Sequence, residues 1–289
     1  MKIALTQFAA DADPAKNLAK QLEMTRAAAD GGAKIVCTQE LFMSKYFCVG
    51  LDGRNFDLAQ KIPSAALESL CAQAKACGVV MVASLFEDRG NGVYHNSAAV
   101  IDADGSFLGL YRKNHIPHDP NFEEKYYFAP GDLGYRAWDT AFGRIGVLIC
   151  WDQWFPEAAR LTAMDGADIV FYPTAIGCIS GESGEDAENF SGAWETVQRG
   201  HAVANGCYVA AANRVGTEEA PNGGFVKFWG GSFCANPYGR VIAKASADSE
   251  EVLFAEVDFG LVAEFRRTWP FFRDRRIDTY SDILKRLKK

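Results

Sequence analysis

Three chemically reactive side chains follow predicted strands in this sequence. Glu40 comes three residues after a predicted strand, Lys113 directly follows another, and Cys150 directly follows the apolar run 145–149. Because strand ends in an open sheet can converge on one crevice, we expect the three side chains to meet. There the glutamate would take the thiol proton, the thiolate would attack a carbonyl carbon, and the lysine would hold the developing oxyanion. The trio therefore predicts acyl transfer by a cysteine nucleophile.

The stretch around Cys150, GRIGVLICWDQWFPEAARL, is typical of a strand that turns at Pro156 into a helix over residues 157–164. Such a turn leaves backbone N–H groups without partners, and we expect those of Trp151 and Asp152 to be free for an oxyanion. A single buried cysteine is usually inert, and an isolated Glu or Lys after a strand is more often solvated. The prediction therefore depends on the three residues together.

The composition limits the class of protein. The 289 residues, 48% of them hydrophobic, can bury a large core, and no linker divides the chain. No apolar run is long enough to cross a membrane, and the start reads as a strand and an acidic loop rather than a signal peptide. The net charge of −7 argues against nucleic acid as a partner. We expect a cytoplasmic protein that binds neither nucleic acid nor membrane.

The eight cysteines contain no CxxC pair, which favours reduced thiols in the cytosol. They also lack the spacing of a metal site, and His115 and His118 are too few to supply one. We expect neither a metal nor an organic cofactor.

Strands and helices alternate along most of the chain. Helices are predicted at 14–29, 63–77, 157–164 and 193–205, and strands at 2–8, 34–37, 79–84, 93–101, 107–112, 135–139, 145–149, 169–172, 208–212, 226–235, 241–245 and 251–257. The Asp102–Gly105 turn predicts a hairpin, and hairpins do not fit a purely parallel doubly wound sheet. This layout predicts an α/β (α+β) sandwich of two mixed sheets that face each other, with helices on the outer faces.

Three segments carry a resemblance to a known family. The Glu in TQELF, the Lys in YRKNHIP and the Cys in GVLICWDQWFPEAAR together resemble the carbon–nitrogen hydrolase, or nitrilase, superfamily, over about Ile3 to Leu284. The resemblance implies a four-layer αββα fold in one domain, 1–289, with a C-terminal arm from about 265. It also implies a catalytic triad of Glu40, Lys113 and Cys150.

In the same family a second glutamate lies between the Lys and the Cys and helps to position the lysine or the substrate. The segment FEEKYYFAPGD matches that loop, with Glu124 as the counterpart and Glu123 as the alternative.

Four further segments, CWDQWFPEAAR, FYPTAIG, NRVG and FFRDRR, most resemble the branch of the superfamily that hydrolyses N-carbamoylputrescine to putrescine, carbon dioxide and ammonia. A cationic aminobutyl tail needs a carboxylate or aromatic faces when it is buried. The candidates for contact with this small-molecule substrate are the acids Asp119, Asp152 and Glu185 and the aromatic residues Tyr46, Tyr126, Trp151 and Trp154.

Several alternatives stay open. A cysteine protease would pair Cys150 with one of the four histidines, His95, His115, His118 and His201, but would leave the Glu and Lys unexplained. Related enzymes act on N-carbamoyl-β-amino acids, on dicarboxylate monoamides or on nitriles, and a substrate with a carboxylate would need an Arg in the pocket. A non-catalytic scaffold would have no need of the trio.

The family resemblance also implies self-association. We expect at least a homodimer, formed through the helices after Cys150 and before Tyr208 and through residues 271–280.

Overall fold

The structure of the chain, a computed structural model, describes residues 1–220 and 223–288. Two six-stranded sheets form its centre, and a three-stranded sheet lies beside them. The first sheet has the order β15 (Glu251–Glu256), β1 (Lys2–Gln7), β2 (Ala33–Cys37), β3 (Val80–Gly90), β4 (Val93–Ile101) and β5 (Phe107–Arg112). The second has the order β14 (Val241–Lys244), β13 (Phe233–Ala235), β10 (Tyr208–Ala212), β8 (Ile169–Pro173), β7 (Gly143–Val147) and β6 (Ala137–Thr140). The small sheet has the order β11 (Thr217–Glu219), β12 (Phe225–Phe228) and β9 (Gly177–Ile179).

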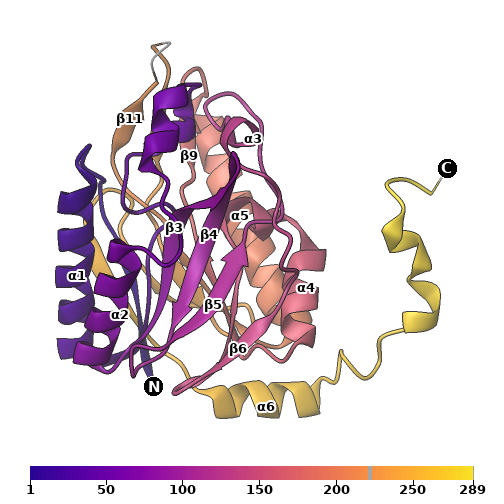
Figure 1. Cartoon of the computed structure of the whole chain (residues 1–289). Coiled ribbons are helices and arrows are strands. Elements are labelled where there is room, and N and C mark those ends of the chain that lie inside the picture. Colours follow the sequence, from indigo (N-terminus) through magenta and orange to yellow (C-terminus); the bar gives the residue numbers. More distant parts are fainter. Residues whose placement is uncertain (221–222, 289) are drawn as a thin grey trace.

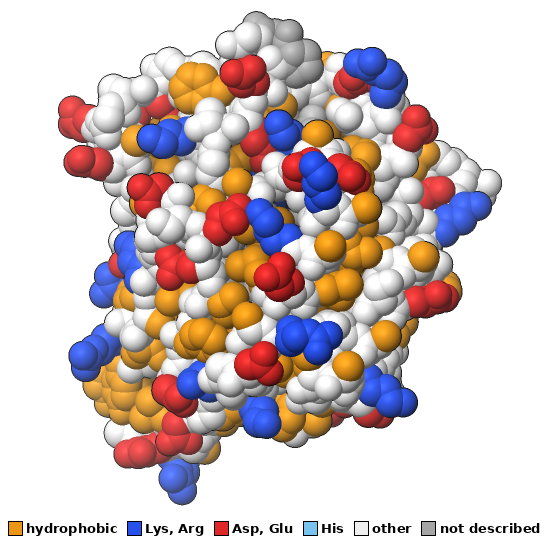
Figure 2. All heavy atoms as spheres, turned by 90° about the vertical axis from the view of Figure 1, so that its left-hand side faces the viewer, with side chains coloured by type: hydrophobic (Ala, Val, Ile, Leu, Met, Phe, Trp, Pro, Cys, Tyr) orange, Lys and Arg blue, Asp and Glu red, His pale blue; other side chains and the backbone are white. Residues whose placement is uncertain are grey.

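Helices cover the outer faces of the large sheets (Figure 1). The helices α1 (Pro14–Asp30) and α2 (Ala65–Cys77) lie on the first sheet, and α4 (Pro156–Met164) and α5 (Gly184–Asn205) lie on the second. Acidic and basic side chains are interspersed on the face that carries α1 and α2 (Figure 2). None of the helices among the described residues is long and apolar enough to cross a bilayer.

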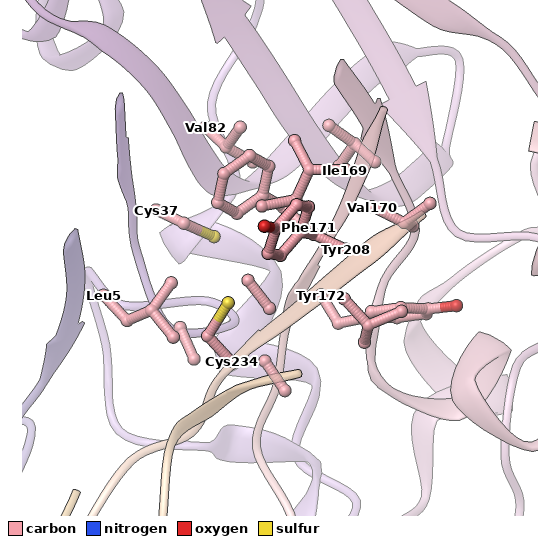
Figure 3. Close-up of a cluster of buried hydrophobic side chains, with 14 of the residues drawn as sticks. Leu5, Cys37, Val82, Ile169, Val170, Phe171, Tyr172, Tyr208 and Cys234 are labelled. Atoms are coloured by element: carbon pink, nitrogen blue, oxygen red, sulfur yellow. The ribbon is translucent and has the colours of Figure 1, made fainter. Parts of the chain in front are cut away.

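Alternation along the strands explains why there are four layers. On β1, Ile3 and Leu5 join the core between the sheets, whereas Ala4 packs in the cluster beneath α1 and α2. This period of two is expected for a strand that is buried on both faces. Figure 3 shows Leu5 in the core between the sheets, with Phe171 of the second sheet in the same cluster. The predicted αββα arrangement is confirmed.

Local signals set most of the predicted helix ends. Asp13 accepts a hydrogen bond from Ala15 N (2.9 Å) at the start of α1, and Ser64 accepts one from Leu67 N (3.1 Å) at the start of α2. At the end of α2, Gly78 takes the left-handed conformation with φ of +61°. The Asp102–Gly105 hairpin also forms as predicted, between β4 and β5.

Two predictions about the second half of the chain are wrong, and β9, β11 and α6 (Phe259–Thr268) were not predicted. The helix α5 begins at Gly184 rather than at residue 193, because Ser183 and Asp186 form a reciprocal capping box. The predicted strand 226–235 is split into β12 and β13, because Gly230 and Gly231 both adopt positive φ and turn the chain into another sheet.

After α6 the chain leaves the two sheets and ends as a segment, residues 269–288, that contains two short 3₁₀-helices, Ile277–Thr279 and Ser281–Leu284, and is drawn in yellow in Figure 1. Near its start, this segment contacts α4 through a cation–π contact of Arg160 with Phe272, at 5.0 Å from the ring centre. Arg275 Nη1 lies 3.1 Å from Met164 Sδ. Ile277, Ile283 and Leu284 are largely exposed.

Candidate active site

A buried cluster of charges lies where the predicted strands end. Lys113 Nζ is 2.8 Å from Glu40 Oε1, and 2.9 and 2.7 Å from the two carboxylate oxygens of Glu124. All three side chains are fully buried. A buried ammonium is tolerated only when it is paired and hydrogen-bonded, and here two carboxylates satisfy it. We call Glu40, Lys113, Glu124 and Cys150 the charged cluster.

The fold holds this cluster from several sides. Lys113 directly follows β5, and its backbone N–H donates to Asn96 O on β4 (2.8 Å). Glu40 lies in the loop after β2, and its N–H donates to Thr174 O (3.2 Å), which follows β8 in the second sheet. Glu124 is the first residue of the short helix α3 (Glu124–Tyr127).

A buried arginine fixes the loop that carries Glu40. Arg214 Nη2 donates to Glu40 O (2.7 Å) and to Leu41 O (3.1 Å), and Nη1 is 2.9 Å from Glu218 Oε1. Leu41 has a positive φ of 47°, a strained value for a side chain of its size. The guanidinium therefore helps to hold the backbone of Leu41, the residue after Glu40, in a conformation that it would not adopt freely.

Cys150 occupies a sharp turn. Its φ is +42°, and it begins the 3₁₀-helix Cys150–Trp154. The Sγ atom lies 3.8 Å from Ala175 O. Strain at a non-glycine residue persists only where the surroundings over-determine it, and such residues cluster at active sites.

The carboxylate of Asp152 closes this turn. It accepts from Ile149 N (3.0 Å), Tyr111 Oη (2.7 Å) and His115 N (3.0 Å), and it is fully buried. Asp152 was predicted to lie on the substrate rim, and that prediction is wrong. Its backbone N–H donates to Ile149 O (3.0 Å), so it is not free for an oxyanion, contrary to expectation.

Electrostatics keep the thiol protonated at rest. Burial, and then the nearby Glu40 carboxylate, raise the pKa of Cys150 well above its usual value, although Lys113 opposes them. A base is therefore needed to generate the thiolate. Glu40 Oε2 is buried and has no hydrogen-bond partner among the described residues, so one oxygen of that carboxylate is available.

The pKa values of Glu124 and Lys113 are both raised, but for different reasons. Burial raises the pKa of Glu124 to about 7, with Glu40 adding to the effect and Lys113 opposing it. Burial alone would lower the pKa of Lys113, but Glu124 and Glu40 outweigh it, and the pKa lies well above its usual value. The lysine stays charged while Glu124 titrates near neutrality.

A cavity of about 510 Å³ has Trp151, the residue after Cys150, in its wall, and we call it the aromatic pocket. Ile176, also in its wall, directly follows Ala175, whose carbonyl contacts the thiol. The pocket is lined by Asp119, Pro120, Phe122, Trp151, Trp154, Ile176, Gly177, Ile179, Glu182, Phe190, Ala193 and Trp229. Its charged lining residues are two acids, Asp119 and Glu182, and no Lys or Arg of the described residues lines it. Such a wall suits a cation.

Known proteins carry the same fold and sequence pattern. The profile of the family described as Carbon-nitrogen hydrolase matches residues 2–267. The chain belongs to the carbon–nitrogen hydrolase family. It is therefore an enzyme that hydrolyses amide-type carbon–nitrogen bonds.

Relatives of this hydrolase match it along nearly its whole length. The "N-carbamoylputrescine amidase" of Solanum lycopersicum is 43% identical and covers 98% of this chain and 94% of its own. The "Citrullinase" of Francisella tularensis is 42% identical, with 99% of both chains covered. The crystal structure of a carbon–nitrogen hydrolase from Helicobacter pylori G27 superposes with a TM-score of 0.94 at 44% identity, covering 99% of each chain.

The predicted substrate contacts divide into two groups in this hydrolase. Trp151, Trp154 and Asp119 line the aromatic pocket. Tyr46 is instead buried against the charged cluster, and its hydroxyl donates to Glu124 Oε1 (2.5 Å). Tyr126 is exposed and packs on Phe56 and Tyr127, and Glu185 is exposed in the first turn of α5; neither residue lines the pocket.

Sequence reasoning missed four residues of the site: Asn96, Glu182, Arg214 and Trp229. Asn96 carried a weak signal, because it lies with His95 and Ser97 in the polar first half of a strand whose second half is apolar. Arg214 carried a weaker one, because it lies within the NRVG segment. Glu182 and Trp229 carried none, since tertiary contacts alone bring them to the pocket.

The histidines have other partners. His115 stacks on Phe155, with ring centres 3.7 Å apart, and its Nδ1 lies 2.7 Å from Asp152 Oδ1. His201 Nε2 lies 2.8 Å from Gln153 O. No histidine of the described chain hydrogen-bonds to Cys150 Sγ, which argues against a cysteine–histidine protease.

Proposed function

We propose that this hydrolase converts N-carbamoylputrescine to putrescine, carbon dioxide and ammonia, a step of polyamine synthesis from agmatine. The observation that carries the proposal is the aromatic pocket, whose charged wall consists of two acids beside a buried thiol. The relatives named as N-carbamoylputrescine amidases support it. The aminobutyl chain would lie between the aromatic faces, with its ammonium near Asp119 and Glu182.

In the first half-reaction, Glu40 Oε2 takes the proton of Cys150, and the thiolate attacks the ureido carbon. Lys113 and the backbone N–H of Trp151 receive the developing oxyanion. The ammonium of Lys113 donates to three carboxylate oxygens, one of Glu40 and two of Glu124. Its contact with Glu124 must therefore relax to one hydrogen bond so that a proton can turn to the substrate. The intermediate collapses, Glu40 returns its proton to the leaving nitrogen, and ammonia departs from a carbamoylated thiol.

In the second half-reaction, Glu40 accepts a proton from water, and the hydroxide attacks the carbonyl carbon of the carbamoylated thiol. The carbon–sulfur bond breaks, and Cys150 regains its proton. The released carbamate of putrescine loses carbon dioxide. Glu124 contacts Lys113 and Tyr46 contacts Glu124, and together they keep the ammonium in place through both steps.

The nearest competing substrates carry a carboxylate, as in citrulline, N-carbamoyl-β-alanine or a dicarboxylate monoamide. A carboxylate in the aromatic pocket would face two acids, and the part of the chain that the structure describes places no Lys or Arg in the wall. Unpaired like charges are a strong means of rejecting a ligand. This charge pattern favours the simple amine.

The test is ammonia release from the purified protein with N-carbamoylputrescine, L-citrulline, N-carbamoyl-β-alanine, glutaramate and an aliphatic nitrile. We expect turnover of the first substrate to dominate and to vanish in Cys150→Ala. A preference for a carboxylate-bearing substrate would overturn the polyamine assignment and leave the thiol chemistry intact. No turnover of any of them would favour a scaffold.

We also propose a homodimer or a larger homo-oligomer in the cytoplasm. Ile277, Ile283 and Leu284 of the C-terminal segment are 74%, 62% and 90% exposed, and Leu161 and Met164 of α4 are also exposed. Exposed apolar side chains on α4 and on the C-terminal segment favour contact with a second copy. The eight free cysteines are consistent with a reducing compartment.

A further inference from the structure

We propose that Asn96 is a positioning residue for Glu40, holding one carboxylate oxygen so that the other is kept for the thiol and the attacking water. The inference rests on the proposed role of Glu40 as the base. It is independent of which carbamoylated or amide substrate the enzyme takes.

The contacts of Asn96 place it between the base and the lysine. Its Nδ2 donates to Glu40 Oε1 at 2.7 Å, and its backbone carbonyl accepts from Lys113 N at 2.8 Å. The side chain is fully buried. Asn96 therefore ties the loop after β2 to the end of β5 through one residue of β4.

These contacts make the two oxygens of Glu40 unequal. Oε1 accepts from both Asn96 Nδ2 and Lys113 Nζ (2.8 Å), whereas Oε2 is buried without a partner among the described residues. Two donors hold Oε1 in place and so fix the orientation of the carboxylate. With Lys113 as the single donor to Oε1, the carboxylate would be freer to rotate. The free oxygen is then the one that can take a proton from Cys150 or water.

An amide suits this position better than the alternatives. A second cation would make Glu40 a weaker base, and a carboxylate would repel it. Folding alone gives no reason for the residue, because Ala98 and Val100, on the same face of β4, lie in the apolar core between the sheets. The Asn96 Oδ1 atom is buried without a partner among the described residues, which costs stability.

The test compares Asn96→Ala with the wild type by two readouts. The first is the rate at which iodoacetamide alkylates Cys150, followed across pH by mass spectrometry of the peptide that contains it. The second is kcat and KM for ammonia release. Loss of a hydrogen bond to a charged group predicts about a ten- to hundredfold fall in the alkylation rate at pH 7 and in kcat, with little change in KM.

Rescue by a conservative variant separates positioning from a general loss of structure. Without the Asn96 donor, Lys113 alone holds Glu40 Oε1, so the alkylation rate should fall at every pH measured. The other titratable or charged groups near Glu40 are Lys113, Glu124, Tyr46, Cys150 and Arg214. All of them are unchanged in the variant. Asn96→Ser, which retains a donor, should recover part of the rate.

Ser97→Ala is the matched control. Ser97 is the next residue of β4, is equally buried, and donates to Glu87 Oε2 (2.6 Å) outside the charged cluster. We expect it to leave the Cys150 alkylation profile unchanged. The proposal is overturned if Asn96→Ala slows alkylation no more than Ser97→Ala does, or if Asn96→Ser is as slow as Asn96→Ala although both are folded.

The two proposals can fail separately. Selective, pH-dependent alkylation of Cys150 that falls in Asn96→Ala, without turnover of N-carbamoylputrescine, would support Asn96 and sink the substrate assignment. Turnover of N-carbamoylputrescine with an unchanged alkylation profile in Asn96→Ala would support the substrate assignment and overturn the role of Asn96.

Discussion

The charged cluster and the aromatic pocket lie side by side but are built in different ways. In the charged cluster, Glu40, Lys113 and Glu124 are fully buried and are joined by bonds of 2.7 to 2.9 Å. In the aromatic pocket, Asp119 is exposed and Trp151 and Trp154 are half-buried. Glu40, Lys113 and Cys150 of the cluster follow strands of the two large sheets, whereas the pocket is assembled from loops, the 3₁₀-helix that begins at Cys150, the short strand β9 and α5.

The difference separates chemistry from selection. The proposed proton relay and oxyanion donor need fixed distances, and side chains at packed strand ends are held at such distances. A pocket that sorts substrates by charge and shape needs only the right groups in its wall. Changes in the cluster should therefore abolish turnover of every substrate, whereas changes in the pocket should alter which substrate is preferred.

The largest effect is expected from the nucleophile. Cys150→Ala should lower kcat/KM by a factor on the order of 10⁴ or more for every substrate, because no other group can form the covalent intermediate. Its thermal unfolding should stay near that of the wild type, since the change is small. A residual rate within tenfold of the wild type would mean that Cys150 is not the nucleophile.

Removal of the central cation should damage the fold as well as the rate. Lys113→Met leaves two buried carboxylates, Glu40 and Glu124, without their counter-ion. Breaking such a pair costs about 3–5 kcal/mol, which urea unfolding would measure. Lys125→Met, at an exposed position in α3, is the control and should cost little. Equal stability of the two variants would show that the charges of the cluster are not coupled.

Next in size is the effect of the pocket acids. Glu182→Gln and Asp119→Asn should each raise KM for N-carbamoylputrescine about tenfold and leave kcat nearly unchanged, because each removes a charge that meets the ammonium. Glu185→Gln, three residues along and outside the pocket, should have no effect. Equal losses for an uncharged amide such as butyramide would contradict selection by charge.

The smallest effect concerns pH and stability. Because the pKa of Glu124 is raised from 4.5 to about 7, the folded protein binds a proton there that the unfolded chain has released. This contribution is fully present below about pH 4.5 and is lost as the pH rises through 7. The free energy of unfolding of the wild type should therefore fall relative to that of Glu124→Gln by on the order of 2 kcal/mol between pH 5 and 8. Parallel stability curves would refute the raised pKa.

The same contrast explains what could be predicted from the sequence. Glu40, Lys113 and Cys150 could be found because each follows a strand that the apolar pattern marks, and Glu124 because its flanks resemble a family segment. Glu182 and Trp229 could not. Glu182 lies just before a helix whose start is set by the Ser183–Asp186 capping box, within a polar stretch that resembles a loop. Trp229 reaches the pocket only because Gly230 and Gly231 break a predicted strand.

Side-chain direction was also beyond the sequence. Tyr46 and Asp152 were expected on the substrate rim, but both point inward, to Glu124 and to the turn at Cys150. A short polar or aromatic residue in a loop gives no periodicity from which its direction can be inferred. Expectations about the fold therefore succeeded more often than expectations about the pocket wall.

The most direct test of the account is the mass of the enzyme during turnover. Acid-quenched protein incubated with N-carbamoylputrescine should carry an adduct equal to the substrate less ammonia, located on the Cys150 peptide and absent from Cys150→Ala. An adduct on Cys150 of this mass would establish the nucleophile, the carbonyl that it attacks and the order of departure. A slowly hydrolysed substrate, tested in parallel, would show that the quench preserves adducts. If its adduct is seen but rapid turnover of N-carbamoylputrescine leaves none on Cys150, the central claim that the buried cluster acts through this thiol is contradicted.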